Sequence, residues 1–124
     1  MNLAKIVLLA EDNTLNRLAC NQILSAMGFH VVNSSSGSEA IAQLRSDAHP
    51  FVLLLTDFRM PGANGNEVIK TARAKSSVIK TILMTSESDE VIREIAKDCA
   101  PDSVIIKPFD IKVLRSTVTR LVPA

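Results

Sequence analysis

Residues 51–57 decide the fold of this chain and read Phe-Val-Leu-Leu-Leu-Thr-Asp. The first five are all apolar, so they lack the alternation expected of a strand with one solvated face. Such runs are typical of parallel strands that helices cover on both sides. Residues 6–9, Ile-Val-Leu-Leu, have the same character. The two runs together predict an α/β fold built on a parallel sheet.

Strand and helix patterns alternate along the rest of the chain. Strands are predicted at residues 6–9, 31–32, 51–55, 81–84 and 104–106, with starts about 20 to 30 residues apart, which is the stride of strand-helix units. Apolar residues at helical spacing predict helices near residues 15–27, 66–74, 91–99 and 111–121. In the first of these helices one face, expected to be the buried one, carries Leu15, Leu18, Ala19, Ile23, Ala26 and Met27.

Two helix starts carry capping signals. Ser36 with Glu39 predicts a capping box, and Asp110 predicts an N-cap for the last helix. Repeated strand-helix units with right-handed crossovers give an open, doubly wound, five-stranded parallel sheet with helices on both faces. Periodicity alone leaves the flavodoxin-like strand order 2-1-3-4-5 and the Rossmann order open. Ligands bind such sheets beyond the carboxyl ends of the strands.

The composition narrows the class of protein. The chain has 124 residues, which predicts a single domain over residues 1–124. Fourteen basic and 13 acidic residues give a net charge of +1, which argues against direct nucleic-acid binding. The apolar runs are far shorter than the roughly 20 residues of a membrane span. Cys20 and Cys99 lie in helical patterns, and residues 1–5 show no signal-peptide character, so a reduced, cytoplasmic protein is expected.

Acidic residues follow two of the predicted strands. Glu11 and Asp12 come after the first strand and Asp57 ends the third. In the order 2-1-3-4-5 these strands are neighbours, so three carboxylates would converge. Two carboxylates about 4 Å apart repel by roughly 4 kcal/mol at an effective dielectric near 20, which calls for a cation. Oxygen ligands favour Mg²⁺ or Mn²⁺. The alternative is that Glu11 and Asp12 merely begin a helix, where its dipole favours acids.

A hydroxyl and an ammonium follow the other two strands. Thr85 ends the fourth strand and Lys107 follows the fifth. A hydrogen-bond donor, a positive charge and a divalent ion are together what a transferred phosphoryl group requires. Each residue alone could be a turn residue or a surface charge.

These residues resemble the receiver domain of two-component response regulators over nearly the whole chain. The resemblance rests on Glu11-Asp12-Asn13, Asp57-x-x-Met60-Pro61-x-x-x-Gly65, Thr85-Ser86 and Lys107-Pro108-Phe109. It implies the order 2-1-3-4-5 and a phosphoryl transfer to Asp57 from a histidine kinase or a histidine phosphotransfer protein. The chain would then be a signalling phosphoacceptor that catalyses only its own phosphorylation and dephosphorylation.

The resemblance also implies a role for each matched residue. Glu11, Asp12, Asp57 and the backbone carbonyl of Arg59 would hold Mg²⁺. Thr85 and Lys107 would contact phosphoryl oxygens, the Lys107-Pro108 peptide would be cis, and Gly65 would allow close packing of the loop.

Three positions modify this interpretation. Receivers often carry an aromatic residue three positions before the lysine, where it acts as a switch with the threonine; here that residue is Val104. Arg59 and Glu87 could pair across the mouth of the site and slow dephosphorylation.

A receiver fold that binds a partner without phosphorylation is the main alternative, and the chain could be a receiver from a hybrid sensor kinase or a multidomain regulator.

Other phosphate chemistries fit less well. A haloacid dehalogenase-type hydrolase needs an Asp two residues after the nucleophile, where this chain has Arg59. An FMN carrier would place the phosphate against Glu11 and Asp12, which would repel it. No P-loop motif is present.

Overall fold

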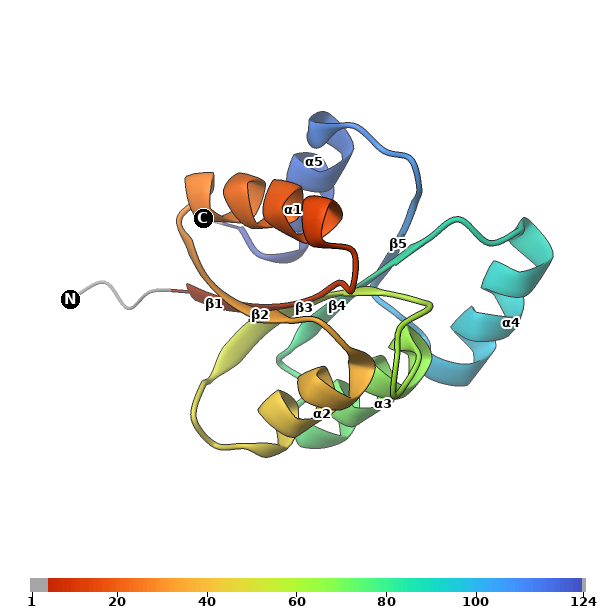
Figure 1. Cartoon of the computed structure of the whole chain (residues 1–124), viewed down its shortest axis with the longest axis horizontal. Helices are drawn as coiled ribbons and strands as arrows, with labels where there is room; N and C mark the ends of the chain where they lie inside the picture. The colour runs from red at the N-terminus through yellow and green to blue at the C-terminus, as the bar shows by residue number, and fades with distance from the viewer. Residues whose placement is uncertain (1–4, 124) are drawn as a thin grey trace.

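A five-stranded parallel sheet forms the centre of the computed structural model, which describes residues 5–123 (Figure 1). The predicted domain covers residues 1–124, and its two ends, residues 1–4 and residue 124, lie outside the described residues. The strands are β1 (Lys5–Ala10), β2 (Phe29–Ser34), β3 (Phe51–Asp57), β4 (Lys80–Thr85) and β5 (Ser103–Ile106). Their order is β2-β1-β3-β4-β5. This confirms the flavodoxin-like order and excludes the Rossmann order.

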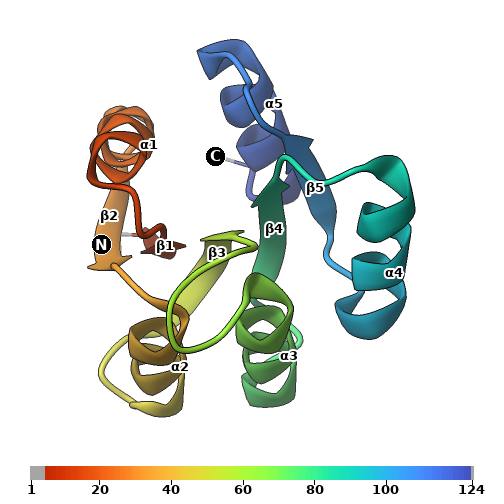
Figure 2. The same cartoon turned by 45° about the vertical axis from the view of Figure 1, so that its right-hand side comes forward.

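Five helices cover the two faces of the sheet. They are α1 (Thr14–Ala26), α2 (Gly37–Arg45), α3 (Gly65–Lys75), α4 (Asp89–Cys99) and α5 (Ile111–Leu121). Figure 2 shows α1 and α5 on one face and α2, α3 and α4 on the other. None of the helices in the described part of the chain is long and apolar enough to cross a bilayer.

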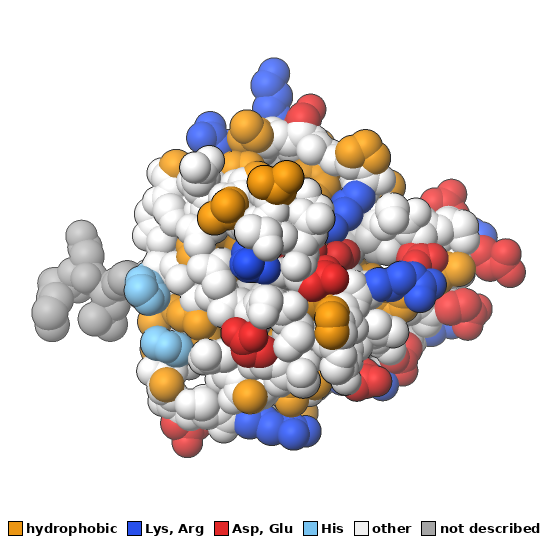
Figure 3. Space-filling model, in the orientation of Figure 1, with side chains coloured by type: hydrophobic (Ala, Val, Ile, Leu, Met, Phe, Trp, Pro, Cys, Tyr) orange, Lys and Arg blue, Asp and Glu red, His pale blue; other side chains and the backbone are white. Residues whose placement is uncertain are grey.

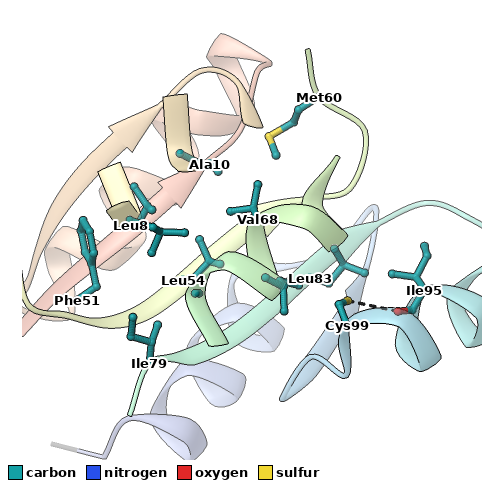
Figure 4. Close-up of a cluster of buried hydrophobic side chains, with 14 residues drawn as sticks. Leu8, Ala10, Phe51, Leu54, Met60, Val68, Ile79, Leu83, Ile95 and Cys99 are labelled. Atoms are coloured by element: carbon teal, nitrogen blue, oxygen red, sulfur yellow. Dashed lines mark hydrogen bonds between the residues drawn. The ribbon is translucent and has the colours of Figure 1, made fainter. Parts of the chain in front are cut away.

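The uniform apolar character of β3 follows from these two layers. Leu54 faces the α2–α4 side, where it packs in a cluster with Leu8 and Leu83 (Figure 4). Leu53 and Leu55 face the α1–α5 side. Because successive strand residues point to opposite faces, a strand with both faces covered needs apolar side chains throughout.

The predicted caps are present, with one change of partner. The Ser36 hydroxyl oxygen accepts a hydrogen bond from the Glu39 N–H at 3.1 Å, and the Asp110 carboxylate caps α5. The Glu39 carboxylate accepts from the Ser35 hydroxyl at 3.1 Å, so the reciprocal contact reaches one residue further back than the capping-box pattern places it. Helix α2 is thus fixed at its first turn.

The prediction for the buried face of α1 is wrong in its first two turns. Leu15 is 78% and Leu18 54% exposed, whereas Cys20 and Leu24 are buried. Helical spacing identifies an apolar stripe, but the stripe on α1 is wider than the strip that the sheet and α5 cover. Which part of it is covered depends on the placement of the helix, which is a tertiary property.

Candidate functional site

The side chains singled out after the strands meet at the carboxyl edge of the sheet. Asp57 ends β3 and Thr85 ends β4, while Glu11 and Lys107 each come directly after β1 and β5. Carboxylate oxygens of Glu11, Asp12 and Asp57 all lie within 4.8 Å of one another. The structure therefore brings the three acids together as the spacing predicts.

Lys107 links two of the acids. Its Nζ lies 2.8 Å from Oε1 of Glu11 and 3.2 Å from Oδ2 of Asp57. Burial lowers the pKa of Lys107, but the hydrogen bond to Glu11 and the charge of Asp57 outweigh burial, so the pKa is raised overall. The ammonium stays charged and pairs with two of the three carboxylates of the site, which leaves the site with an excess of negative charge.

Glu11 is wholly buried, and its carboxylate is fixed on both oxygens. Oε1 accepts from Lys107, and Oε2 accepts from the Asn13 N–H at 3.2 Å. Asn13 is the N-cap of α1, and the first turn of that helix contains no acidic residue. The two acids therefore lie at the N-terminus of α1, directly before its N-cap, and they also meet Asp57 at the sheet edge.

Asp57 and Thr85 are held by backbone donors. Oδ1 of Asp57 accepts from the Phe58 N–H at 2.9 Å, which leaves Oδ2 toward Lys107. Oγ1 of Thr85, a residue only 2% exposed, accepts from the Glu87 N–H at 3.1 Å. Within residues 5–123 the Thr85 hydroxyl proton has no acceptor, so it is available to a group bound beside Asp57.

The loop after β3 approaches β3 closely at Gly65. The Gly65 N–H donates to the carbonyl oxygen of Phe58 at 2.6 Å. A Cβ at this position would overlap the carbonyl oxygen of Asp57. The expectation that Gly65 permits close packing is confirmed, and the packing fixes the backbone that carries Asp57.

Two further predictions about geometry are confirmed. The Lys107-Pro108 peptide is cis. Arg59 and Glu87 form an ion pair between Nε and Oε1, and this hydrogen bond raises the pKa of Arg59. Glu87 is part of the loop after β4, so the pair joins the loops that follow β3 and β4. Val104 is half-buried on β5 and packs against the cluster under α2–α4.

The sequence of the chain matches a known family of signalling domains. The profile of the response regulator receiver domain matches residues 7–119. The chain belongs to this family.

Named relatives of this receiver domain include multidomain and single-domain proteins. It is 31% identical to the transcriptional regulatory protein AruR of Pseudomonas aeruginosa over 94% of this chain and 48% of that protein. It is 25% identical to the sporulation initiation phosphotransferase F of Bacillus subtilis, covering 94% of this chain and 93% of the relative. The chain spans about half the length, or less, of the first curated relatives it matches.

A solved structure supports both the family and the fold. The response regulator protein TrrA of Thermotoga maritima, in complex with Mg²⁺ and BeF, has a TM-score of 0.82 at 26% identity, covering 95% of this chain and 99% of that one. The family match and this shared fold place the chain among the receiver domains of two-component signalling.

Sequence reasoning missed two features of this receiver domain. A cleft of about 370 Å³ lies between α1 and the β5–α5 loop, with Glu11, Cys20 and Phe109 among its lining residues. Burial, followed by the charge of Glu11, raises the pKa of Cys20 to about 11, so its thiol is neutral. The second feature is Arg17, whose Nη1 donates to the carbonyl oxygen of Glu11 at 2.8 Å. No motif marks either, because both depend on how α1 packs.

Proposed function

We propose that this receiver domain is the phosphoacceptor of a two-component phosphorelay, with Asp57 as the acceptor. A single observation carries the proposal. The Asp57 carboxylate lies 3.2 Å from Lys107 within a cluster of three acids, beside the uncommitted hydroxyl of Thr85. This arrangement joins a nucleophile to groups that can bind the oxygens of a phosphoryl group.

The donor set fits a divalent cation. Glu11, Asp12 and Asp57 supply carboxylate oxygens within 4.8 Å of one another, and three acids against one lysine leave negative charge to balance. Hard oxygen ligands suit Mg²⁺ or Mn²⁺. The backbone carbonyl of Arg59 would complete the protein ligands. When bound, the cation would offset charge on the phosphoryl oxygens.

The residues of the chain have separate tasks in the transfer. An Asp57 carboxylate oxygen forms a bond to phosphorus while the bond from phosphorus to the donor histidine nitrogen breaks, and the electron pair stays on that nitrogen. Lys107 donates to one phosphoryl oxygen and the Thr85 hydroxyl to another. Catalysis is then mostly positioning and electrostatics, which a prebuilt site supplies without moving charge far.

The phosphoryl donor would be a histidine kinase or a histidine phosphotransfer protein. Leu15 and Leu18 are exposed on α1, and Ile111, which is exposed on α5, lines the cleft that opens at Lys107. Figure 3 shows hydrophobic side chains gathered over α1. Exposed apolar side chains on α1 and α5, the two helices that flank this cleft, fit a protein donor whose histidine must reach Asp57.

We extend the proposal to the conformational switch and to the lifetime of the phosphorylated state. Thr85 would respond to the phosphoryl group, and Val104 would take the place of the usual aromatic partner. The Arg59–Glu87 pair would limit the approach of water to the phosphorylated Asp57. A cytoplasmic location without direct nucleic-acid contact fits two free cysteines and a near-zero net charge.

Val104 favours one other candidate function. A receiver without the aromatic switch could bind its partner regardless of phosphorylation, alone or as part of a hybrid kinase or multidomain regulator. Partner capture with and without beryllofluoride separates the two. Equal capture in both states would support the phosphorylation-independent module.

The direct test is labelling by acetyl phosphate in the presence of Mg²⁺. The Asp57→Asn variant should lose all labelling, since its amide is not a nucleophile. Asp47→Asn, a matched change at a carboxylate that pairs with Lys75 on the surface, should keep it. Undiminished labelling of Asp57→Asn would remove the assignment.

A further inference from the structure

Arg17 contacts the site through the main chain of Glu11 and not through a carboxylate. It is half-buried in the second turn of α1, and its Nη1 donates to the carbonyl oxygen of Glu11 at 2.8 Å. Its own N–H donates to the Asn13 carbonyl at 2.9 Å, so the residue is anchored in the helix. Among the ion pairs formed within residues 5–123 Arg17 has none. Its side chain therefore serves a main-chain group and not a carboxylate.

With the Arg17 contact, every polar group of Glu11 has a hydrogen-bond partner. The two carboxylate oxygens accept from Lys107 and Asn13, and the Glu11 N–H donates to the carbonyl oxygen of Ser34 at 3.1 Å. The remaining polar group of Glu11 is its carbonyl oxygen, and Arg17 binds it. That carbonyl belongs to the peptide that joins Glu11 to Asp12. Arg17 thus fixes the orientation of this peptide plane.

Asp12 depends on that peptide plane. Its side chain is exposed, and in the described part of the chain its carboxylate has no hydrogen-bond or ion-pair partner. One of its oxygens nevertheless lies within 4.8 Å of oxygens of Glu11 and Asp57. With no side-chain contact to hold it, the direction of Asp12 is set by its backbone.

We infer that Arg17 is a positioning residue for divalent-cation binding, because it orients Asp12 through the Glu11 carbonyl. The inference rests on the proposed function. Groups that hydrogen-bond to metal-binding segments orient the ligands without touching the metal, and their loss weakens metal binding. Arg17 reaches the site from α1, a helix that contributes no other group to the acidic cluster.

The charge of Arg17 makes the inference testable by the sign of one effect. A guanidinium close to the acids repels a divalent cation, so by electrostatics alone its removal would tighten Mg²⁺ binding. If Arg17 positions the peptide between Glu11 and Asp12, its removal would free that peptide and weaken Mg²⁺ binding. The two roles predict opposite changes in the same quantity.

The experiment is calorimetric titration of Mg²⁺ into the folded chain. Arg17→Ala should weaken Mg²⁺ binding about tenfold. Arg17→Lys keeps the charge and one donor, and it should recover part of the loss. Arg93→Ala is the matched control, because it removes an equal charge from an exposed position on α4 and should leave the affinity unchanged.

Three results would overturn the inference. Tighter Mg²⁺ binding by Arg17→Ala would show that Arg17 acts only as a charge. Lower stability in urea with an unchanged affinity would show a structural role only. Should Arg17→Ala fail to fold, Arg17→Met, which keeps most of the side-chain length but neither the charge nor a donor, takes its place, and unchanged affinity in that variant would have the same meaning. Absence of Mg²⁺ binding by the wild-type chain would contradict the proposed function itself, and the inference with it.

Discussion

The two ends of β4 carry the same residue in opposite roles. Thr81, at the amino end, is fully buried, and its hydroxyl donates to Oδ2 of Asp102 at 3.2 Å while it accepts from the Asp102 N–H at 3.1 Å. Thr85, at the carboxyl end, is also buried but accepts only from a backbone N–H. The Thr81 hydroxyl therefore has both a donor and an acceptor within the fold, whereas the Thr85 hydroxyl keeps its proton for a ligand.

The acids at the two ends differ in the same way. Oδ2 of Asp102 accepts from both the N–H and the hydroxyl of Thr81, so its hydrogen-bond donors are neutral groups of the fold, and the Arg73 guanidinium lies further away, at 3.9 Å. Asp57 has one backbone donor and shares Lys107 with Glu11. The carboxyl end of β4 thus has polar groups that the fold leaves without a partner, and these groups are available to a ligand.

The largest expected difference between the two ends of β4 concerns the basic side chains there, Lys107 and Arg73. Lys107→Met leaves the buried carboxylate of Glu11 without its partner, which should cost about 3 to 5 kcal/mol of unfolding free energy. It should also abolish labelling. Arg73→Met breaks a pair with Asp102 at 3.9 Å on the exposed side of α3 and should cost about 0 to 1 kcal/mol. Urea unfolding measures both, and equal losses would contradict the distinction.

The raised pKa of Lys107 adds a pH dependence. A group with a folded-state pKa above its ordinary value of 10.5 contributes stability below that pH and loses it as pH rises through the folded-state pKa. The difference in stability between the wild type and Lys107→Met should therefore stay constant from neutral pH up to the ordinary lysine pKa and shrink above it. A difference that vanished at neutral pH would show that the ion pair is not formed.

The two threonines give the next largest difference. Thr85→Val removes a donor to a charged phosphoryl oxygen, worth about 1.5 kcal/mol, which corresponds to labelling about tenfold slower. Thr81→Val leaves Asp102 short of a donor and should lower stability with no change in labelling. Acetyl phosphate labelling and urea unfolding of both variants test the pair. Slower labelling in Thr81→Val would mean that the ends are coupled.

Exposed apolar residues at the two ends give a smaller effect. Leu15→Asp should weaken phosphotransfer from a histidine-containing protein donor about fivefold, since part of its apolar area would be buried on docking. Labelling by acetyl phosphate should not change. Val78→Asp is the control, because Val78 is 70% exposed just before the amino end of β4. Equal losses in the two variants would exclude a docking surface on α1.

The smallest effect is expected at the mouth of the site. Arg59→Gln and Glu87→Gln each break an exposed ion pair and should speed dephosphorylation about threefold, because such pairs are weak. The double variant should be no faster than either single one if the pair acts as a unit. Decay of the phosphorylated chain measures this rate. Unchanged decay in all three variants would end the proposal that the pair shields Asp57.

Much of the fold could be predicted because local patterns match it. Residues 51–57 identified a strand covered on both faces, and Ser36 and Asp110 identified two helix starts. The strand order could not be derived from periodicity, since both candidate orders use identical strand-helix units; it came from the resemblance. The exposure of Leu15 was missed because amphipathic spacing does not say how far a helix extends past the sheet.

The sequence by itself determined which chemical groups are present and that they follow strands, since carboxylates, a hydroxyl and an ammonium at strand ends of a parallel sheet must share one edge. Only the tertiary structure decided how those groups are partnered. Lys107 is 96 residues from Glu11 in the chain, and Arg17 reaches the Glu11 carbonyl only because α1 packs beside β1. Contacts between distant segments depend on packing geometry, which no local pattern encodes.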